Sequence, residues 1–135
     1  MKDRLAVMVL ALWWGSLTTL AGFVVPMLFA NLPSPALAGN LAGRLFSVQN
    51  GVSIVCGLLI LLTSVQRTRN PGASGSYAAI GFASLGMILA LLIEFGVSPR
   101  ILARDQLKLW HTVGSVLYAV QWTCVGLLLW RATRR

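Results

Sequence analysis

The chain is poor in charge, and in acidic residues above all. Among its 135 residues only three are Asp or Glu, and charged residues make up 10% of the total. A soluble domain carries about 25% charged residues. This shortfall excludes an ordinary water-exposed surface, and it indicates that lipid is the natural solvent of the chain.

Histidine, cysteine and catalytic motifs are scarce as well. His111 is the one histidine, and two cysteines, Cys56 and Cys124, lie inside apolar runs without CxxC spacing. Buried cysteines of this kind behave as small hydrophobic residues. The chain also lacks a nucleophile elbow, a phosphate loop and an HExxH motif. We therefore predict that the protein is not an enzyme, has no catalytic residue and holds no metal or cofactor.

Four apolar stretches are long enough to cross a bilayer, which takes about 20 residues of helix. They cover approximately residues 5–30, 45–65, 76–97 and 108–130. Each is predicted to be a helix, because backbone groups in lipid must form hydrogen bonds within their own segment. The first run spans roughly 25 residues, more than the roughly 7–15 residues of the apolar region of a signal peptide, so we expect it to be retained.

Proline, glycine and polar residues predict the breaks between these spans. The breaks fall at Asn31–Pro35, Arg67–Gly72 and Gly96–Pro99. The segment Ala36–Arg44 is predicted to be a short helix on the outer membrane surface. Pro26 is expected to bend the outer end of the first span, because it removes a backbone donor.

The distribution of Lys and Arg predicts the orientation. The net charge is +8, from 11 Lys and Arg against three Asp and Glu. The side that holds both termini would carry Lys2, Arg4, Arg67, Arg69, Arg131, Arg134 and Arg135. The opposite side would carry only Arg44, Arg100, Arg104 and Lys108. Since Lys and Arg favour cytoplasmic loops, both termini are predicted to be cytoplasmic.

The short connections make successive helices antiparallel neighbours. The predicted fold is therefore all-α: an integral membrane four-helix bundle, up-down-up-down, in one domain over residues 1–135. Basic residues at the ends of spans favour membrane lipids as partners and argue against nucleic acid. Small residues at four-residue spacing, such as Ser53 and Gly57, allow close packing within the chain or in a homo-oligomer or with another membrane protein.

Polar residues follow one face of the fourth span. His111, Ser115, Tyr118 and Trp122 recur at helical spacing, and Gln121 lies beside them. This face is predicted to point into the bundle, because a Gln or His in lipid would lack partners.

The first span carries polar residues of its own. They lie in Trp13-Trp14-Gly15-Ser16 and Thr18-Thr19. One interpretation is a packing knob with hydroxyls bonded to their own helix. The other is a polar track that leads to the outer end of the bundle.

Further polar residues fall at the depth of His111. Gln49 and Asn50 lie near the start of the second span and Glu94 near the end of the third, so all lie within about 10 Å of the outer boundary. Charged residues of the adjoining loops complete the set. This outer polar cluster comprises Arg44, Gln49, Asn50, Glu94, Arg100, Arg104, Asp105, His111, Ser115 and Gln121.

Three interpretations of the outer polar cluster follow. In the leading one it is a structural clamp, in which Glu94 pairs with Arg100 or Arg44, and the protein acts by packing against a partner or a copy of itself. In the second it is an outward-facing site for transport or binding of a small ligand, ion or proton. The third is haem or metal ligation by His111, which the single histidine disfavours, because Met27 is the only other ligand at a suitable depth.

Several short motifs together resemble a known family. They are Trp14-Gly15-Ser16, Gly39, Gly43-Arg44-Leu45-Phe46, Pro99-Arg100, Arg104-Asp105, His111, Ser115 and Gln121. The combination extends over nearly the whole chain and resembles the bacterial membrane-protein family of unknown function related to transmembrane protein 205. The resemblance implies a small protein of the bacterial inner membrane without an agreed mechanism. It also implies a distant relation to four-helix proteins of copper resistance and haem synthesis, whose paired ligands this chain's single histidine cannot supply.

Overall fold

The computed structural model describes residues 2–69 and 76–134, and it consists of helices joined by short turns, with no strand in these ranges. The first rod joins α1 (Lys2–Thr19), the π-helical turn η1 (Leu20–Val24) and α2 (Val25–Asn31). The second is α3 (Pro35–Thr68). The third joins α4 (Ser76–Leu91), the π-helical turn η2 (Leu92–Val97) and α5 (Ser98–Leu102), and the fourth is α6 (Leu107–Thr133).

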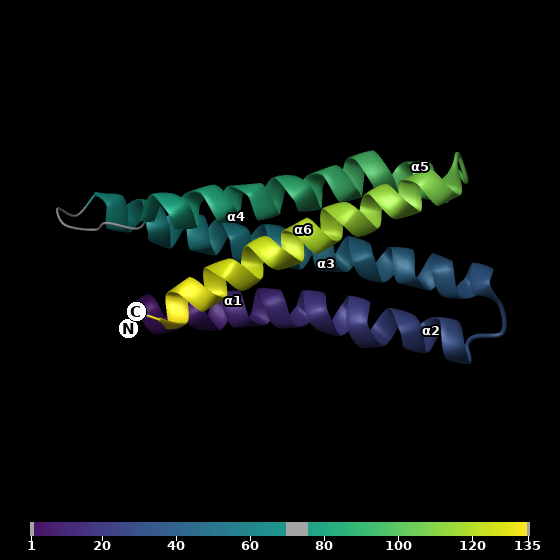
Figure 1. Cartoon of the computed structure of the whole chain (residues 1–135), viewed down its shortest axis with the longest axis horizontal. Coiled ribbons are helices and arrows are strands. Elements are labelled where there is room, and N and C mark those ends of the chain that lie inside the picture. The colour runs from purple at the N-terminus through teal and green to yellow at the C-terminus, as the bar shows by residue number, and fades with distance from the viewer. Residues whose placement is uncertain (1, 70–75, 135) are drawn as a thin grey trace.

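The four rods lie side by side, and both ends of the chain lie at the same end of the bundle (Figure 1). Helix α3 packs on α1 and α4, and α6 packs on the same two helices. All four rods are long and apolar enough to cross a membrane; these stretches are Arg4–Asn31, Pro35–Thr68, Tyr77–Leu102 and Leu107–Thr133. The prediction of an all-helical chain with four apolar, span-length helices is confirmed.

Two of the predicted boundaries are wrong. Ala36–Arg44 is not a separate surface helix but the first part of α3, which begins at Pro35 where the Ser34 hydroxyl caps it by accepting the Leu37 N–H at 3.2 Å. The third span does not end at Val97 but continues through Pro99 to Leu102. Proline in the first turn of a helix costs no hydrogen bond. Of the predicted break at Arg67–Gly72, residues 70–72 lie outside the described residues, and α3 reaches Thr68.

A proline lies two residues beyond the end of each π-helical turn. In η1 the last bond runs from the Val25 N–H to the Leu20 carbonyl, and Pro26 follows. In η2 it runs from the Ser98 N–H to the Ile93 carbonyl, and Pro99 follows. A π turn inserts an extra residue, and π turns and prolines are both recognised causes of local irregularity in helices. Helical structure continues on both sides of each proline.

Trp13 fills the centre of the bundle. Its side chain is 0% exposed. A Cβ atom on Gly86 would lie 3.0 Å from Trp13 Cη2, and one on Gly57 would lie 3.3 Å from the same atom and 2.6 Å from Met87 Sδ. Glycine at position 86 therefore lets α4 approach the indole ring, and glycine at position 57 makes room on α3 for Met87 of α4 first and then for the indole ring. The interpretation of Trp13 as a packing knob is confirmed.

We expect Gly86→Ala to lower the free energy of unfolding by about 1–3 kcal/mol, the usual cost of overpacking a core. The added methyl group would lie 3.0 Å from Trp13 Cη2. Gly81→Ala in the same helix is the matched control, since no atom lies within 4 Å of its added Cβ and alanine favours helix. Thermal unfolding in detergent, followed by circular dichroism, compares the two. Equal destabilisation of both variants would contradict this packing.

Candidate functional site

Polar side chains inside the bundle bind one another across helices. Asn50 of α3 is 1% exposed, and its Nδ2 donates to Oε2 of Glu94 in η2 at 2.8 Å. The neighbouring Gln49 donates from Nε2 to the Ser16 hydroxyl of α1 at 3.0 Å. Two adjacent residues therefore link α3 to the first rod and to the third.

A second pair of hydrogen bonds links α6 to α1. The hydroxyl of Tyr118, which is buried, donates to the Leu17 carbonyl at 2.9 Å. One turn further along α6, Trp122 Nε1 donates to the Thr18 hydroxyl at 2.8 Å. Together these four hydrogen bonds join each of the four rods to another.

The hydroxyl groups of α1 serve two partners each. Ser16 and Thr18 donate to carbonyls of their own helix, those of Trp13 at 2.9 Å and Trp14 at 2.8 Å. They also accept from Gln49 and Trp122 as described above. The two interpretations of these residues therefore both apply: the hydroxyls are bonded within α1, and they extend the polar set of the bundle.

Glu94 is the only acidic residue within the four membrane-length stretches. It is half-buried and lies within the π-helical turn η2. This turn lies close to α6, because a Cβ on Gly114 would lie 3.1 Å from Val97 Cγ1. Single π turns in helices often occur at functional sites.

The predicted ion pair between Glu94 and Arg100 or Arg44 is wrong. Arg100 donates from Nη1 to the Gly96 carbonyl at 2.9 Å, and its guanidinium carbon lies 4.3 Å from the centre of the Trp110 ring. Arg44 is exposed. In the described ranges the carboxylate of Glu94 accepts from the neutral amide of Asn50 instead. The arginine at the end of the third rod folds back onto its own helix.

The prediction that His111 and Ser115 point into the bundle is also wrong. Both side chains are exposed, and the Ser115 hydroxyl donates to the His111 carbonyl of its own helix at 2.9 Å. The buried side of α6 carries Tyr118 and Gln121, and toward the first residue of the helix it includes the half-buried Gly114. The His111 side chain lies next to this side of the helix and not on it. For Tyr118 and Gln121 the predicted inward orientation is confirmed, whereas Trp122 is 38% exposed and only its Nε1 reaches α1.

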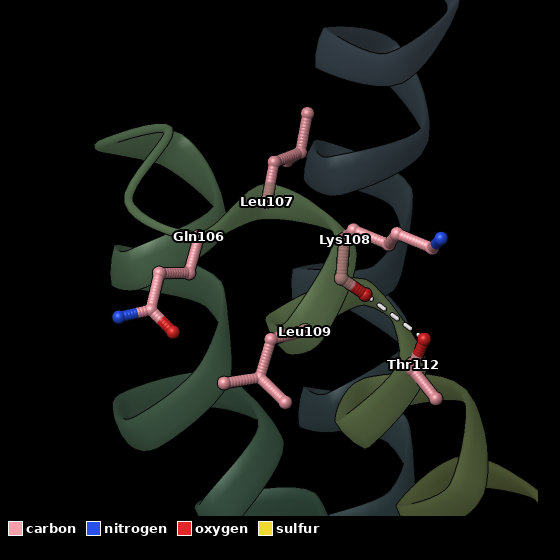
Figure 2. Close-up of a pocket in the computed structure, with 5 residues that line it drawn as sticks. All are labelled: Gln106, Leu107, Lys108, Leu109 and Thr112. Atoms are coloured by element: carbon pink, nitrogen blue, oxygen red, sulfur yellow. Dashed lines mark hydrogen bonds between the residues drawn. The ribbon is translucent and has the colours of Figure 1, made fainter.

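The loop residues of the outer polar cluster lie apart from these interior contacts. Arg104 and Asp105 are exposed in the turn before α6, where Arg104 has φ of 53° and Gln106 has φ of 42°. Figure 2 shows the surface hollow beside this turn, lined by Gln106, Leu107, Lys108, Leu109 and Thr112. The side chains of Gln106 and Lys108 point to opposite sides of it. Because its polar groups do not converge, we place the candidate site in the bundle interior.

Ser53 is a buried polar residue that the outer polar cluster did not include. Ser53 and Gln121 are both 0% exposed. The Ser53 hydroxyl oxygen and both polar atoms of the Gln121 amide have no hydrogen-bond partner among the described residues. Ser53 could have been predicted to be buried, because it follows Gln49 and Asn50 by one helical turn and therefore lies on the same face of α3.

The interior offers one carboxylate in a set of neutral hydrogen-bonding groups. Among residues 2–69 and 76–134, no three His, Cys, Asp or Glu side chains gather as a possible metal site. His111 and Met27 are exposed, and Cys56 and Cys124 are buried free thiols. The chemistry that this arrangement supports is hydrogen bonding to the Glu94 carboxylate.

A double-mutant cycle between Asn50→Ala and Glu94→Ala is expected to give a coupling free energy of about 0.6–2 kcal/mol, the range for interhelical hydrogen bonds in membranes. The measurement is unfolding of each variant in lipid–detergent micelles. A cycle between Arg44→Ala and Glu94→Ala is the control and should give coupling close to zero, because Glu94 binds Asn50. Stronger coupling to Arg44 than to Asn50 would contradict the observed hydrogen bond.

Comparison with protein families matches residues 8–109 to a domain of unknown function, DUF4149. The matched region includes the hydrogen-bonded residues of the first three rods, and it ends before Tyr118 and Gln121. No curated protein and no solved structure matches the chain. Since the match covers most of the chain, the protein belongs to the DUF4149 family.

Proposed function

We propose that this chain is a small, non-enzymatic protein of the bacterial inner membrane that takes up and releases a proton at Glu94 from the outer side. One observation carries the proposal: the Glu94 carboxylate, in a π-helical turn of the third rod, accepts a hydrogen bond of 2.8 Å from the buried Asn50. An ionisable residue inside a membrane is costly, and such residues mark functional sites.

The neutral partner suits a group that changes its protonation state. The Asn50 amide has donors on Nδ2 and an acceptor on Oδ1. It donates to Glu94 when the carboxylate is charged, and its oxygen can accept from the carboxylic acid when Glu94 is protonated. An arginine would stabilise only the charged form, whereas an amide can bind both forms.

The groups around Glu94 favour a proton over a metal ion. The elements that pack against η2 are α3, α4, α5 and α6. Among the charged or titratable residues of these elements, Arg44, Arg100, Lys108 and His111 are exposed, Cys56 and Cys124 are buried free thiols, and Tyr118 binds the Leu17 carbonyl. A hard metal ion takes six or more oxygen ligands, whereas a proton needs a single carboxylate.

The membrane orientation is part of this proposal. An up-down-up-down bundle with cytoplasmic termini places Glu94 toward the outer side, about 12 Å of helix before the end of the rod at Leu102. Membrane lipids are then the immediate partners of the exposed apolar side chains. We also propose that the family of this chain is related to transmembrane protein 205.

Infrared spectroscopy of the protein in lipid vesicles tests the proposal. Lowering the external pH is expected to convert the Glu94 carboxylate into a carboxylic acid with its own C=O stretching band. Glu94→Gln should abolish this band, and Asn50→Leu should shift it, because the hydrogen bond to the amide is lost. Asp105→Asn is the matched control and should leave the band in place, since Asp105 lies exposed in a turn.

The structural clamp is the competing hypothesis, and the same variants distinguish it. If the protein acts only by packing against a partner or a copy of itself, Glu94→Gln lowers stability or association and no pH-dependent band belongs to Glu94. A band that persists in Glu94→Gln, or that is missing from the wild type, would overturn proton exchange at this residue and favour the clamp.

A further inference from the structure

The interior of the bundle contains polar atoms that no protein group binds. Gln121 is 0% exposed, and its Nε2 and Oε1 have no hydrogen-bond partner among the described residues. The same holds for the hydroxyl oxygen of Ser53, which is also 0% exposed. Buried polar groups in native proteins are almost always hydrogen-bonded, to protein or to water.

Contacts on the inner side of these residues fix the register of the four rods. The Trp13 ring lies against the backbone of Gly57 and Gly86, and a Cβ on Gly86 would also lie 3.8 Å from Val125 Cγ2. One layer of the bundle therefore contains Trp13 of α1, Gly57 of α3, Gly86 of α4 and Val125 of α6.

Hydrogen bonds on the outer side fix the register again. Asn50 of α3 binds Glu94 of η2, and the Tyr118 hydroxyl of α6 reaches the Leu17 carbonyl of α1. These bonds lie about two helical turns from the Trp13 layer on the second, third and fourth rods, and one turn from it on α1. One turn from Trp13, Gly57, Gly86 and Val125, in the direction of these bonds, lie Leu17, Ser53, Ala90 and Gln121, each 0% exposed, which we call the central polar layer.

Gln121 is the one long polar side chain of the central polar layer. Ser53 and Ala90 are small, and Leu17 is the only large apolar residue of the four. Gln121 lies about 21 Å along α6 from its first residue, Leu107, near the middle of the helix. Neither bulk water nor lipid head groups reach this depth, so the partner of these polar atoms must be held inside the bundle.

We propose that the central polar layer binds ordered water, hydrogen-bonded to Gln121 and Ser53. A buried water makes two to four hydrogen bonds, and the layer supplies the amide donor, the amide acceptor and the hydroxyl. The Trp13 Nε1 donor, also without a protein partner, lies one turn away. Two of the groups are N–H donors, which repel a cation, and water both donates and accepts. This site does not depend on proton exchange at Glu94.

Magnetisation transfer between water and glutamine side chains tests the site. The full chain, labelled with ¹⁵N at glutamine and placed in lipid nanodiscs, contains Gln49, Gln66, Gln106 and Gln121. Gln121→Leu assigns the Gln121 amide, and if that variant does not fold, Gln→Leu at the other three positions assigns it by elimination. The Gln121 amide protons are expected to show a nuclear Overhauser effect to water with the sign of a slowly tumbling, bound molecule.

Internal controls separate bound water from bulk solvent. Exposed Gln106 should show only fast exchange with bulk water, and Gln49, bonded to Ser16, should show no bound water. Ser53→Ala should reduce the Gln121 signal several-fold, whereas Ser47→Ala on the exposed side of α3 should not change it. A Gln121 amide that shows transfer only to protein protons, or a water signal unaffected by Ser53→Ala, would overturn the proposed site.

Discussion

A polar side chain between apolar helices of membrane-spanning length must find its hydrogen-bond partner inside the bundle, and the arrangement of this chain follows from that constraint. Asn50 finds Glu94, Gln49 finds Ser16, and Tyr118 finds a carbonyl of α1. Each bond stabilises the bundle by only about 0.6–2 kcal/mol. Leaving any of these groups unpaired in an apolar environment would cost more, so the bonds define which faces of the helices meet.

Close packing on the side of these bonds that faces the chain termini supports them. Trp13 lies against glycine backbone on α3 and α4, which draws both helices toward α1. The π-helical turn at Leu92–Val97 carries the only carboxylate of the membrane-length stretches. An extra residue in one turn changes which side chains face the bundle downstream, so the turn decides where Glu94 lies relative to Asn50.

Much of the fold follows from the sequence, since four apolar runs of sufficient length predict four helices without tertiary information. Burial of Gln121 was also predictable, because an amide in lipid lacks partners. The orientation of His111 was not, because consecutive helical residues differ by about 100° and Ser115 satisfies its hydroxyl within its own helix. The depth of Glu94 along its span predicted that arginine and amide groups both lie near it. Depth alone could not predict that Asn50 is its hydrogen-bond partner. The π turn, which periodicity does not reveal, affects that choice.

The central claim is that the carboxylate of the third rod is bound by a neutral amide of α3. A solid-state nuclear magnetic resonance measurement of the distance between Asn50 Nδ2 and Glu94 Cδ, on protein in lipid bilayers, tests it most directly. The structure predicts a strong dipolar coupling, because Asn50 Nδ2 lies 2.8 Å from Glu94 Oε2. No coupling to Asn50, together with strong coupling of Glu94 Cδ to an arginine guanidinium nitrogen, would contradict the account.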